Sequence, residues 1–352
     1  MDLQQGIAAV RPPCEKSRVQ AAQRFSDIAM PLGSLGLLQD AVAQIAAIRR
    51  TPRPSIAKRA VVMFCADNGV VAEGVTQCGQ EVTATVTENM GRGRSAVCLM
   101  ARHIGMDSFP VDIGVARDVQ GERILHRKIR YGTADMTKQA AMTRAEAVRA
   151  VETGMELAQW CAAQEYDLLC GGEMGIGNTT TSAAVTAALT GADVQTVTGR
   201  GAGLSSEGLE RKVRAIQTAL ALHRPDPSDP LDVLHKVGGL DIAGLAGLYL
   251  GAAACGLPVV LDGVISCTAA LVAVRLCPTV RGYLLAGHRS EEPAGALLLR
   301  ELELQPFITA GMRLGEGTGA VAAVSLLDLV FAAYDGMPSF AEAGVEAYQP
   351  LT

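Results

Sequence analysis

Short apolar runs alternate with long amphipathic segments along most of the 352-residue chain. "AVVMFCADNG" (60–69), "YDLLCGGEMG" (166–175) and "LPVVLDG" (257–263) each lead from an apolar run into Asp, Asn or Gly, as buried strands do where they meet a loop. Segments 143–164 and 206–223 have the apolar spacing of helices. Such alternation is typical of a parallel sheet with helices on both faces. The sequence therefore predicts an α/β fold whose ligand site lies at the carboxyl ends of the strands.

The N-terminal region has a different pattern. "EKSRVQAAQRFSDIAM" (15–30) and "LGLLQDAVAQIAAIRR" (35–50) repeat apolar residues every three or four positions, and "PLGS" separates them. This spacing predicts two amphipathic helices joined by a turn. We expect them to form a small satellite beside the α/β domain.

The composition excludes several classes of protein. Hydrophobic residues make up 49% and charged residues 19% of the chain, which is enough for a sizeable core. A net charge of -5 argues against a general nucleic-acid binder. The N-terminus lacks a signal-peptide pattern, and Gly, Asp and Pro interrupt the longest apolar stretch, 239–260, so we expect no membrane span. Nine scattered cysteines without a C-x-x-C pair predict reduced thiols in a cytoplasmic protein, with neither metal nor cofactor.

A glycine-rich loop, "GGEMGIGNTTTSAA" (171–184), stands between a predicted strand and a predicted helix that begins near Asn178. Free N–H groups at a helix N-terminus bind anions, and the threonine hydroxyls add donors. The alternative is a tight turn with an ordinary N-cap. The loop has neither the lysine of a P-loop nor the glycine order of a dinucleotide-binding loop. It therefore favours a phosphomonoester over a nucleoside triphosphate.

Two further glycine-rich loops open helices, "TGRGAGLSSEG" (198–208) and "LGEGTGAV" (314–321), and we expect all three loops to follow strands at their carboxyl ends. The second carries Glu316 between two glycines. An acidic residue there often complements the helix dipole. At the ligand edge of a sheet, the same carboxylate is also able to act as a general base.

In this order, "GEMGIGNTTTSAA", "GRGAGL" and "GEGTGA" resemble the motifs of nicotinate-nucleotide–dimethylbenzimidazole phosphoribosyltransferases. The resemblance extends from about Pro31 to the final helix. It implies transfer of the 5-phosphoribosyl group of nicotinate mononucleotide to the lower-ligand base of cobalamin, giving an α-riboside 5′-phosphate and nicotinate. It also implies a Rossmann-like domain over residues 56–336 and a small helical domain over 1–55, completed by about 337–352. Members are dimers, so we expect a homodimer or a heterodimer with a paralogue.

The resemblance also assigns roles to residues. Glu316 matches the catalytic carboxylate, which takes the ring N–H proton of the benzimidazole while its other nitrogen attacks C1′ of the ribose. The loop at Gly175, Gly177, Asn178 and Thr179 matches the phosphate cradle, and Glu173 lies beside the ribose or base. The remaining positions assigned to the nucleotide site are Gly175, Ile176, Gly177, Asn178, Thr179, Gly201, Gly203, Lys212, Asp262 and Ser290.

The acceptor pocket departs from the family pattern. Gln77 and Thr85 stand where a Ser…Gln pair is expected, with Gln80 nearby, and Asn68 stands in place of a histidine. Leu314 and Gly315 are also assigned to this pocket. Some members of the family that the chain resembles accept purines or phenolics, so adenine, another benzimidazole and a phenol stay open as acceptors, with dimethylbenzimidazole as the favoured one. A non-catalytic paralogue is a further alternative, although an inactive subunit has no chemical need for the Glu316 carboxylate.

Overall fold

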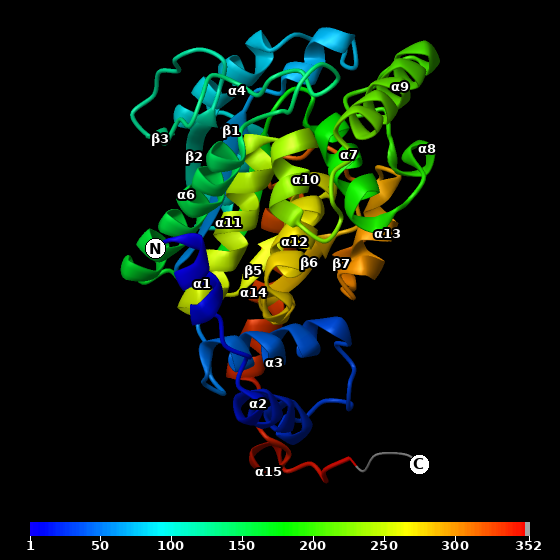
Figure 1. Ribbon diagram of the computed structural model, residues 1–352. Coiled ribbons are helices and arrows are strands. Elements are labelled where there is room, and N and C mark those ends of the chain that lie inside the picture. Colours follow the sequence, from blue (N-terminus) through cyan, green and yellow to red (C-terminus); the bar gives the residue numbers. More distant parts are fainter. Residues whose placement is uncertain (349–352) are drawn as a thin grey trace.

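Seven parallel strands form one sheet in the order β3-β2-β1-β4-β5-β6-β7 in the computed structural model, which describes residues 1–348 (Figure 1). The direction of strand order reverses between β1 and β4, and ligands bind at such a switch point in open α/β sheets. The strands are β1 Arg59–Ala66, β2 Asp107–Gly114, β3 Leu125–His126, β4 Leu168–Met174, β5 Val259–Leu261, β6 Leu284–His288 and β7 Pro306–Ile308.

Strand β1 shows why the apolar runs are nearly continuous. Val62 and Phe64 face one hydrophobic core, and Val61, Met63 and Cys65 face the other. All eight residues of the strand are buried. A strand covered on both faces needs apolar side chains at every position rather than at alternate ones.

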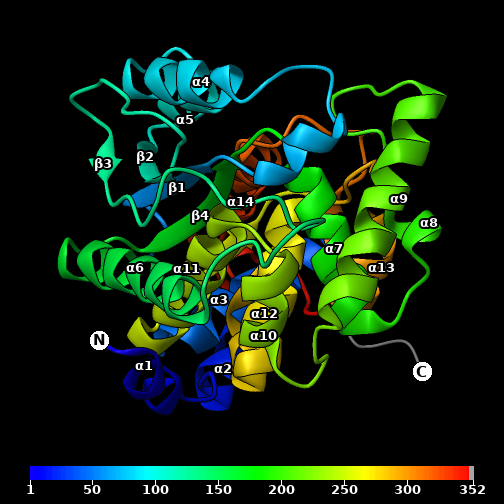
Figure 2. The ribbon, with the colours of Figure 1, turned by 45° about the horizontal axis from the view of Figure 1, so that its top comes forward.

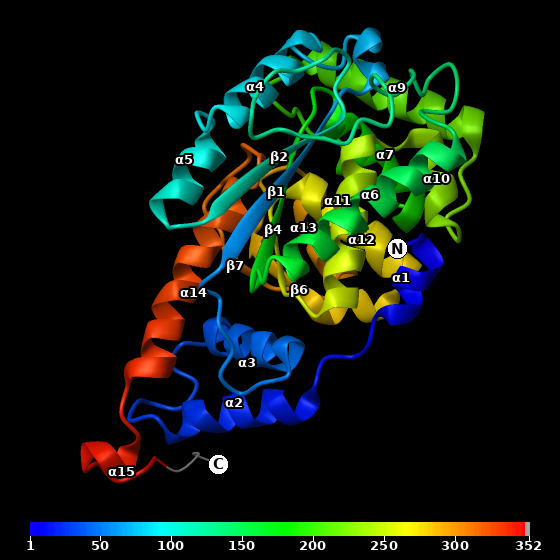
Figure 3. The same cartoon turned by 90° about the vertical axis from the view of Figure 1, so that its left-hand side faces the viewer.

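Helices cover both faces of the sheet (Figure 3). One core includes side chains from α1 Leu3–Ala9, α6 Arg144–Ala163, α7 Asn178–Thr190, α9 Ser206–His223, α10 Pro230–Val237, α11 Leu240–Cys255, α12 Val264–Leu276 and α13 Ala294–Glu301. The other includes side chains from α2 Glu15–Asp27, α3 Leu37–Arg49, α4 Glu81–Gly91, α5 Ala96–His103 and α14 Thr318–Gly336. The short elements are η1 Gly69–Glu73, α8 Val194–Val197, η2 Pro278–Tyr283 and α15 Phe340–Ala343. The α/β prediction is confirmed.

Glycines in both helices let α11 lie directly on α6. A Cβ atom at Gly247 would collide with the backbone of Val151, and one at Gly154 would collide with the carbonyl of Gly244. The helix is buried along almost its whole length. The apolar stretch 239–260 is therefore a core helix that continues into β5.

Helix α14 is long and apolar enough by length and composition to cross a membrane. Half of its most apolar window is buried, and residues such as Val324 and Leu327 belong to the core beneath the sheet. Its packing accounts for its hydropathy. Such a helix by itself is weak evidence for a membrane span.

Helices α2 and α3 lie together beyond the end of the sheet opposite α4 and α9, beside α15 (Figures 1 and 3). A bridge between Ile28 and Ser339 joins the two ends of the chain there. Helix α1 instead packs on α6, where the Leu3 N–H donates to Glu152. The predicted domain boundary at residue 55 stays a prediction. Residues 349–352, which the sequence assigned to the small helical domain, lie outside the described residues.

Candidate active site

A cavity of about 680 Å³ opens at the carboxyl ends of the strands, and residues at or just after the ends of β4, β5 and β6 line it. Figure 2 looks toward this edge, with α4 and α9 on opposite sides and α7 and α14 between them. Three glycine-rich loops supply most of its wall. The residues that line it are Val75, Thr76, Gln77, Cys78, Val86, Glu173, Met174, Gly175, Ile176, Gly177, Asn178, Thr179, Arg200, Gly201, Ala202, Gly203, Leu204, Asp262, Gly263, Val264, Ile265, Ser266, His288, Ser290, Glu292, Arg313, Leu314, Gly315 and Glu316.

The loop before α7 brings a helix N-terminus to the cavity. Gly177 is the N-cap with a φ of 92°, a left-handed conformation that favours glycine, and it provides no side-chain cap. A Cβ at Gly175 would collide with the carbonyl of Ala66, so this residue lets the loop lie directly on the end of β1. The first turn of α7 therefore faces the cavity without a capping side chain of its own.

Lys212 lies behind this loop. It is fully buried, and its Nζ donates to Thr179 Oγ1 at 2.7 Å and to the carbonyl of Gly199 at 3.0 Å. Burial lowers the pKa of the Lys212 ammonium to about 8, with Glu292 acting in the opposite direction. A cation beneath a helix N-terminus is suited to a phosphate at the same corner of the cavity.

Glu316 occupies the turn before α14 in a left-handed conformation, with a φ of 64°. Its Oε2 accepts a hydrogen bond from the Val97 N–H, at 3.3 Å, in the first turn of α5. Burial raises the pKa of the Glu316 carboxyl, and the Val97 hydrogen bond opposes the rise. A half-buried carboxylate with a raised pKa is a stronger base than an exposed one.

Asp262 holds the loop that carries Glu316. Its carboxylate accepts hydrogen bonds from the backbone N–H groups of Gly317 at 3.1 Å, Gly319 at 2.7 Å and Ala320 at 3.2 Å. The His288 Nε2 lies 3.4 Å from its Oδ1. The Asp262 carboxylate, which follows β5, therefore caps the N-terminus of α14 and places a negative charge there.

A third carboxylate, Glu173, lies one residue before the end of β4 and lines the same cavity. The Asn178 side-chain amide donates to Glu173 Oε2, and at 3.0 Å to Asp241 Oδ2. Desolvation first, and then the charge of Asp241, raises the pKa of Glu173 to about 8. Desolvation also raises the pKa of Asp241 to about 6. The floor of the cavity thus concentrates carboxylates, which favours positive charge in a bound molecule.

A phosphoribosyltransferase family model matches residues 10–345. The chain is 46% identical to the nicotinate-nucleotide–dimethylbenzimidazole phosphoribosyltransferase of Acetivibrio thermocellus, over 93% of each chain. It is 42% identical to the enzyme of that name from Clostridium acetobutylicum, over 100% of each. The crystal structure of the Thermus thermophilus enzyme of this name superposes with a TM-score of 0.89, at 40% identity, covering 95% of this chain and 99% of that one. The chain belongs to the nicotinate-nucleotide–dimethylbenzimidazole phosphoribosyltransferase family.

The structure brings most of the positions assigned from this family to one cavity. All of them line it except Lys212, Gln80 and Thr85. Lys212 contacts it through Thr179. The Gln80 side chain donates to the carbonyl of Asn68 at 3.3 Å, outside the wall.

Two details differ from the expected placement. Thr85 is exposed on α4, and its hydroxyl donates to the carbonyl of Glu81 at 2.9 Å, because a threonine in a helix readily bonds one turn back. Val86, the next residue, lines the cavity instead. The loop with Gly201 and Gly203 follows helix α8 rather than a strand, although it contributes to the same wall.

Sequence reasoning missed several residues of this site. Asp241 stands alone as a charge inside an apolar stretch, a signal that was available in "GGLDIAG". His288 ends a predicted strand, and Arg313 lies three residues before Glu316. Both line the cavity.

Proposed function

We propose that this chain transfers the 5-phosphoribosyl group of nicotinate mononucleotide to a lower-ligand base, with 5,6-dimethylbenzimidazole as the favoured acceptor. The products are an α-riboside 5′-phosphate and nicotinate. The observation that carries the proposal is the pairing, in one cavity, of an open helix N-terminus backed by Lys212 with the Glu316 carboxylate.

The phosphate would bind at the first turn of α7. Its oxygens accept from backbone N–H groups and from the Thr179 hydroxyl, which the Lys212 ammonium contacts at 2.7 Å. A dianion at this corner places an opposite charge near the Lys212 ammonium, which burial has stripped of its hydration. Binding of the phosphate therefore fixes the ribose with C1′ toward the carboxylates of the cavity floor.

Glu316 would act as the general base. Its carboxylate takes the ring N–H proton of the benzimidazole, and the lone pair of the other ring nitrogen forms the new bond to C1′. The bond between C1′ and nicotinate breaks, and its electron pair returns to the pyridinium nitrogen. Attack from the face opposite the leaving group converts the β-nucleotide into an α-riboside.

The carboxylate-rich floor supports this chemistry. Positive charge develops at C1′ as the pyridinium leaves, and the Glu316 and Asp262 carboxylates line the cavity. Fixed negative groups placed where positive charge develops stabilise a transition state without reorganising. Positioning and one base suffice, because the pyridinium is already a good leaving group.

The assembly and location are also part of this proposal. We propose a homodimer in the cytoplasm, with a heterodimer of paralogues as the alternative. All nine cysteines are unpaired in the structure, which suits a reducing compartment. Light scattering of the purified chain, alone and mixed with a paralogue, separates the two assemblies.

The test is product formation from nicotinate mononucleotide with dimethylbenzimidazole, adenine or phenol, followed by chromatography and mass. An α-riboside phosphate with any acceptor supports the reaction class, and the ranking of acceptors reports on the Gln77 and Val86 side of the cavity. Binding of the nucleotide without product from any acceptor would instead favour a subunit that depends on a partner.

A further inference from the structure

Asp241 is a fully buried carboxylate at the start of α11. Its Oδ1 accepts from the Ile242 N–H at 3.0 Å, and its Oδ2 accepts from the Asn178 amide at 3.0 Å. Both donors are neutral. Burial of a carboxylate between neutral donors is unfavourable for folding, because neither donor compensates fully for the lost hydration. The residue therefore calls for an explanation other than stability.

Its contacts lead step by step to the catalytic loop. The Asn178 amide that donates to Asp241 also donates to Glu173 Oε2. The other oxygen of that carboxylate, Oε1, accepts from the Glu316 N–H at 3.4 Å. Three segments far apart in the sequence are thus joined: the start of α11, the start of α7 with the phosphate loop, and the turn before α14.

The position of Asp241 also fixes it under the nucleotide loop. A Cβ at Gly175 would lie 2.9 Å from Asp241 Oδ2 and 3.1 Å from Asn68 Nδ2. The carboxylate is therefore packed directly against the turn that precedes Gly177.

We propose that Asp241 is a positioning residue for phosphoribosyl transfer, acting through the Asn178 amide on Glu173 and thereby on the backbone of Glu316. This role rests on the proposed function. Asp241 touches none of the reacting atoms in it. Its contribution is to hold the base in place relative to the bound nucleotide.

The charge of Asp241 acts along the same path. The groups that face Glu173 are Asp241 from α11, Asp262 from the end of β5, the Asn178 amide from α7 and the Glu316 N–H. After desolvation, the charge of Asp241 is the largest cause that raises the pKa of Glu173. Removing it lowers that pKa, so Glu173 loses its proton at a lower pH. A second anion then stands beside the loop of Glu316 under neutral conditions.

Asp241→Asn removes the charge and keeps the shape. We expect kcat to fall about tenfold or more, since small displacements of a base cost large factors in rate. KM for nicotinate mononucleotide stays close to the wild-type value, and the melting temperature is unchanged or raised. Because Glu173 then loses its proton at a lower pH, the alkaline limb of the kcat/KM profile moves to lower pH. Asp241→Ser provides a second uncharged variant that retains an acceptor for the Ile242 N–H.

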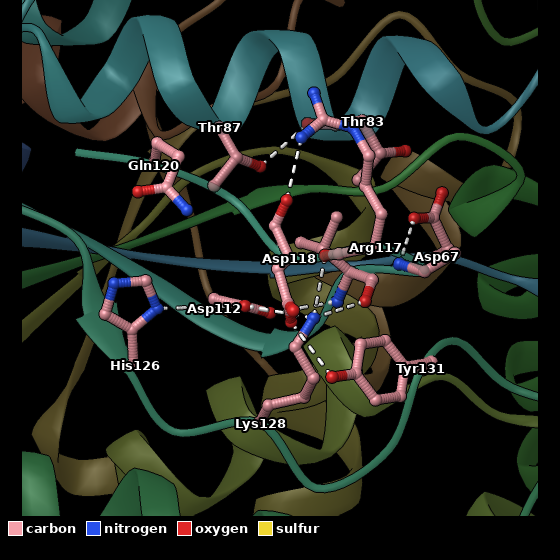
Figure 4. A network of polar contacts seen from close by, with 12 residues as sticks. Asp67, Thr83, Thr87, Asp112, Arg117, Asp118, Gln120, His126, Lys128 and Tyr131 are labelled. Carbon is pink, nitrogen blue, oxygen red and sulfur yellow. Dashed lines mark hydrogen bonds and ion pairs between the residues drawn. The ribbon is translucent and has the colours of Figure 1, made fainter.

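Asp112 offers the matched control (Figure 4). It is another buried aspartate at this edge of the sheet, but its Oδ2 lies 3.1 Å from the Lys128 ammonium. Lys128 also donates to the carbonyls of Val115 and Arg117, and these contacts hold the loop after β2. Asp112→Asn leaves Lys128 without its carboxylate, so we expect a lower melting temperature with kcat and the pH profile unchanged.

The outcomes separate the two proposals. A wild type that forms no α-riboside phosphate overturns the proposed function itself. An active wild type with an equally active Asp241→Asn, or with an unmoved pH profile, overturns only the positioning role. Loss of folding in both Asp241 variants, while Asp112→Asn still folds, would show that Asp241 is purely structural.

Discussion

Two Gly-x-Gly turns precede helices at the same edge of the sheet, yet they present their helix N-termini differently. Before α14, Gly317 has a φ of 102°, and the carboxylate of Asp262 accepts from three N–H groups around it. Before α7, Gly177 has a φ of 92° and provides no side-chain cap. The central residue also differs, Glu316 in one turn and Ile176 in the other.

The difference indicates a division of roles. The N-terminus of α14 is capped by the Asp262 carboxylate, which fixes the loop, so the Glu316 side chain is not used as the cap. The other is available to an external anion, with Lys212 behind it. Under the proposed function, the same local backbone positions a base in one turn and binds a phosphate in the other.

The largest effect is expected when the base is removed from the first turn. Glu316→Gln keeps the shape of the side chain but cannot accept the acceptor's proton. We expect kcat to fall by about 10²–10⁴, the range that general bases contribute. Affinity for nicotinate mononucleotide, measured by calorimetry, stays near the wild-type value because the phosphate binds at the other turn.

Glu291→Gln is the matched control, since Glu291 is exposed close to the same cavity. It should leave turnover unchanged. If Glu316→Gln loses nucleotide affinity and turnover together, the two turns do not divide their roles in this way.

The next largest effect is expected when the Asp262 carboxylate is removed. Asp262→Ala leaves three N–H groups at the start of α14 without their acceptor. We expect a loss of about 3 kcal/mol or more in the free energy of unfolding, because these hydrogen bonds involve a buried charge. Turnover should fall as well, since the Glu316 loop loses its support. Urea unfolding and steady-state kinetics measure the two effects.

Asp229→Ala tests whether any helix-capping aspartate would do the same. Asp229 accepts from Leu231 and Asp232 at the start of α10, away from the cavity lining. We expect about 1 kcal/mol lost and normal turnover. Equal effects of the two variants on turnover would mean that Asp262 acts through global stability alone.

The phosphate turn should respond to loss of its cation. Lys212→Met keeps the buried stem and removes the ammonium, so we expect the Kd of nicotinate mononucleotide to rise about tenfold or more, at the upper end for a hydrogen bond to a charged group. Arg214→Met makes the same charge change at an exposed position of α9, where Arg214 pairs with Glu210. It should leave the Kd unaltered, and an equal rise would point to long-range charge instead of a local contact.

Local sequence identified the two turns but not their difference. The apolar runs and glycines dictate strands, loops and helix starts, so the sheet and most of the cavity wall were predictable. Whether an N-terminus is capped depends on Asp262, which is distant from α14 in the sequence. Only the pairing of β5 with its neighbours in the sheet places that carboxylate under the turn.

The same limit explains the misplaced acceptor residue. Thr85 occupies a plausible position along the sequence, but the rotation of α4 about its axis sets which residues face the cavity. Val86 faces it, and Thr85 faces solvent. Helix rotation is set by the core contacts of Ala84 and Met90, which no short motif encodes.

The smallest expected effect is a pH dependence confined to the phosphate turn. The pKa of Lys212 in the nucleotide-free protein is about 8, lowered by burial. A bound phosphate dianion favours the ammonium and raises that pKa, so binding above pH 8 requires proton uptake. Affinity should therefore be flat between about pH 7 and 8, and fall by up to about tenfold per pH unit above 8.

Calorimetry of nicotinate mononucleotide binding from about pH 7 to 9.5 measures this dependence. The pKa of Glu173 is also about 8, so its ionisation occurs over the same range. Lys212→Met separates the two groups, since it removes the lysine and leaves Glu173 in place. A flat profile in the variant assigns the dependence to the lysine beneath α7. An undiminished fall in the variant would assign it to the carboxylates of the floor, and the phosphate turn would then lack the cation that distinguishes it from the turn before α14.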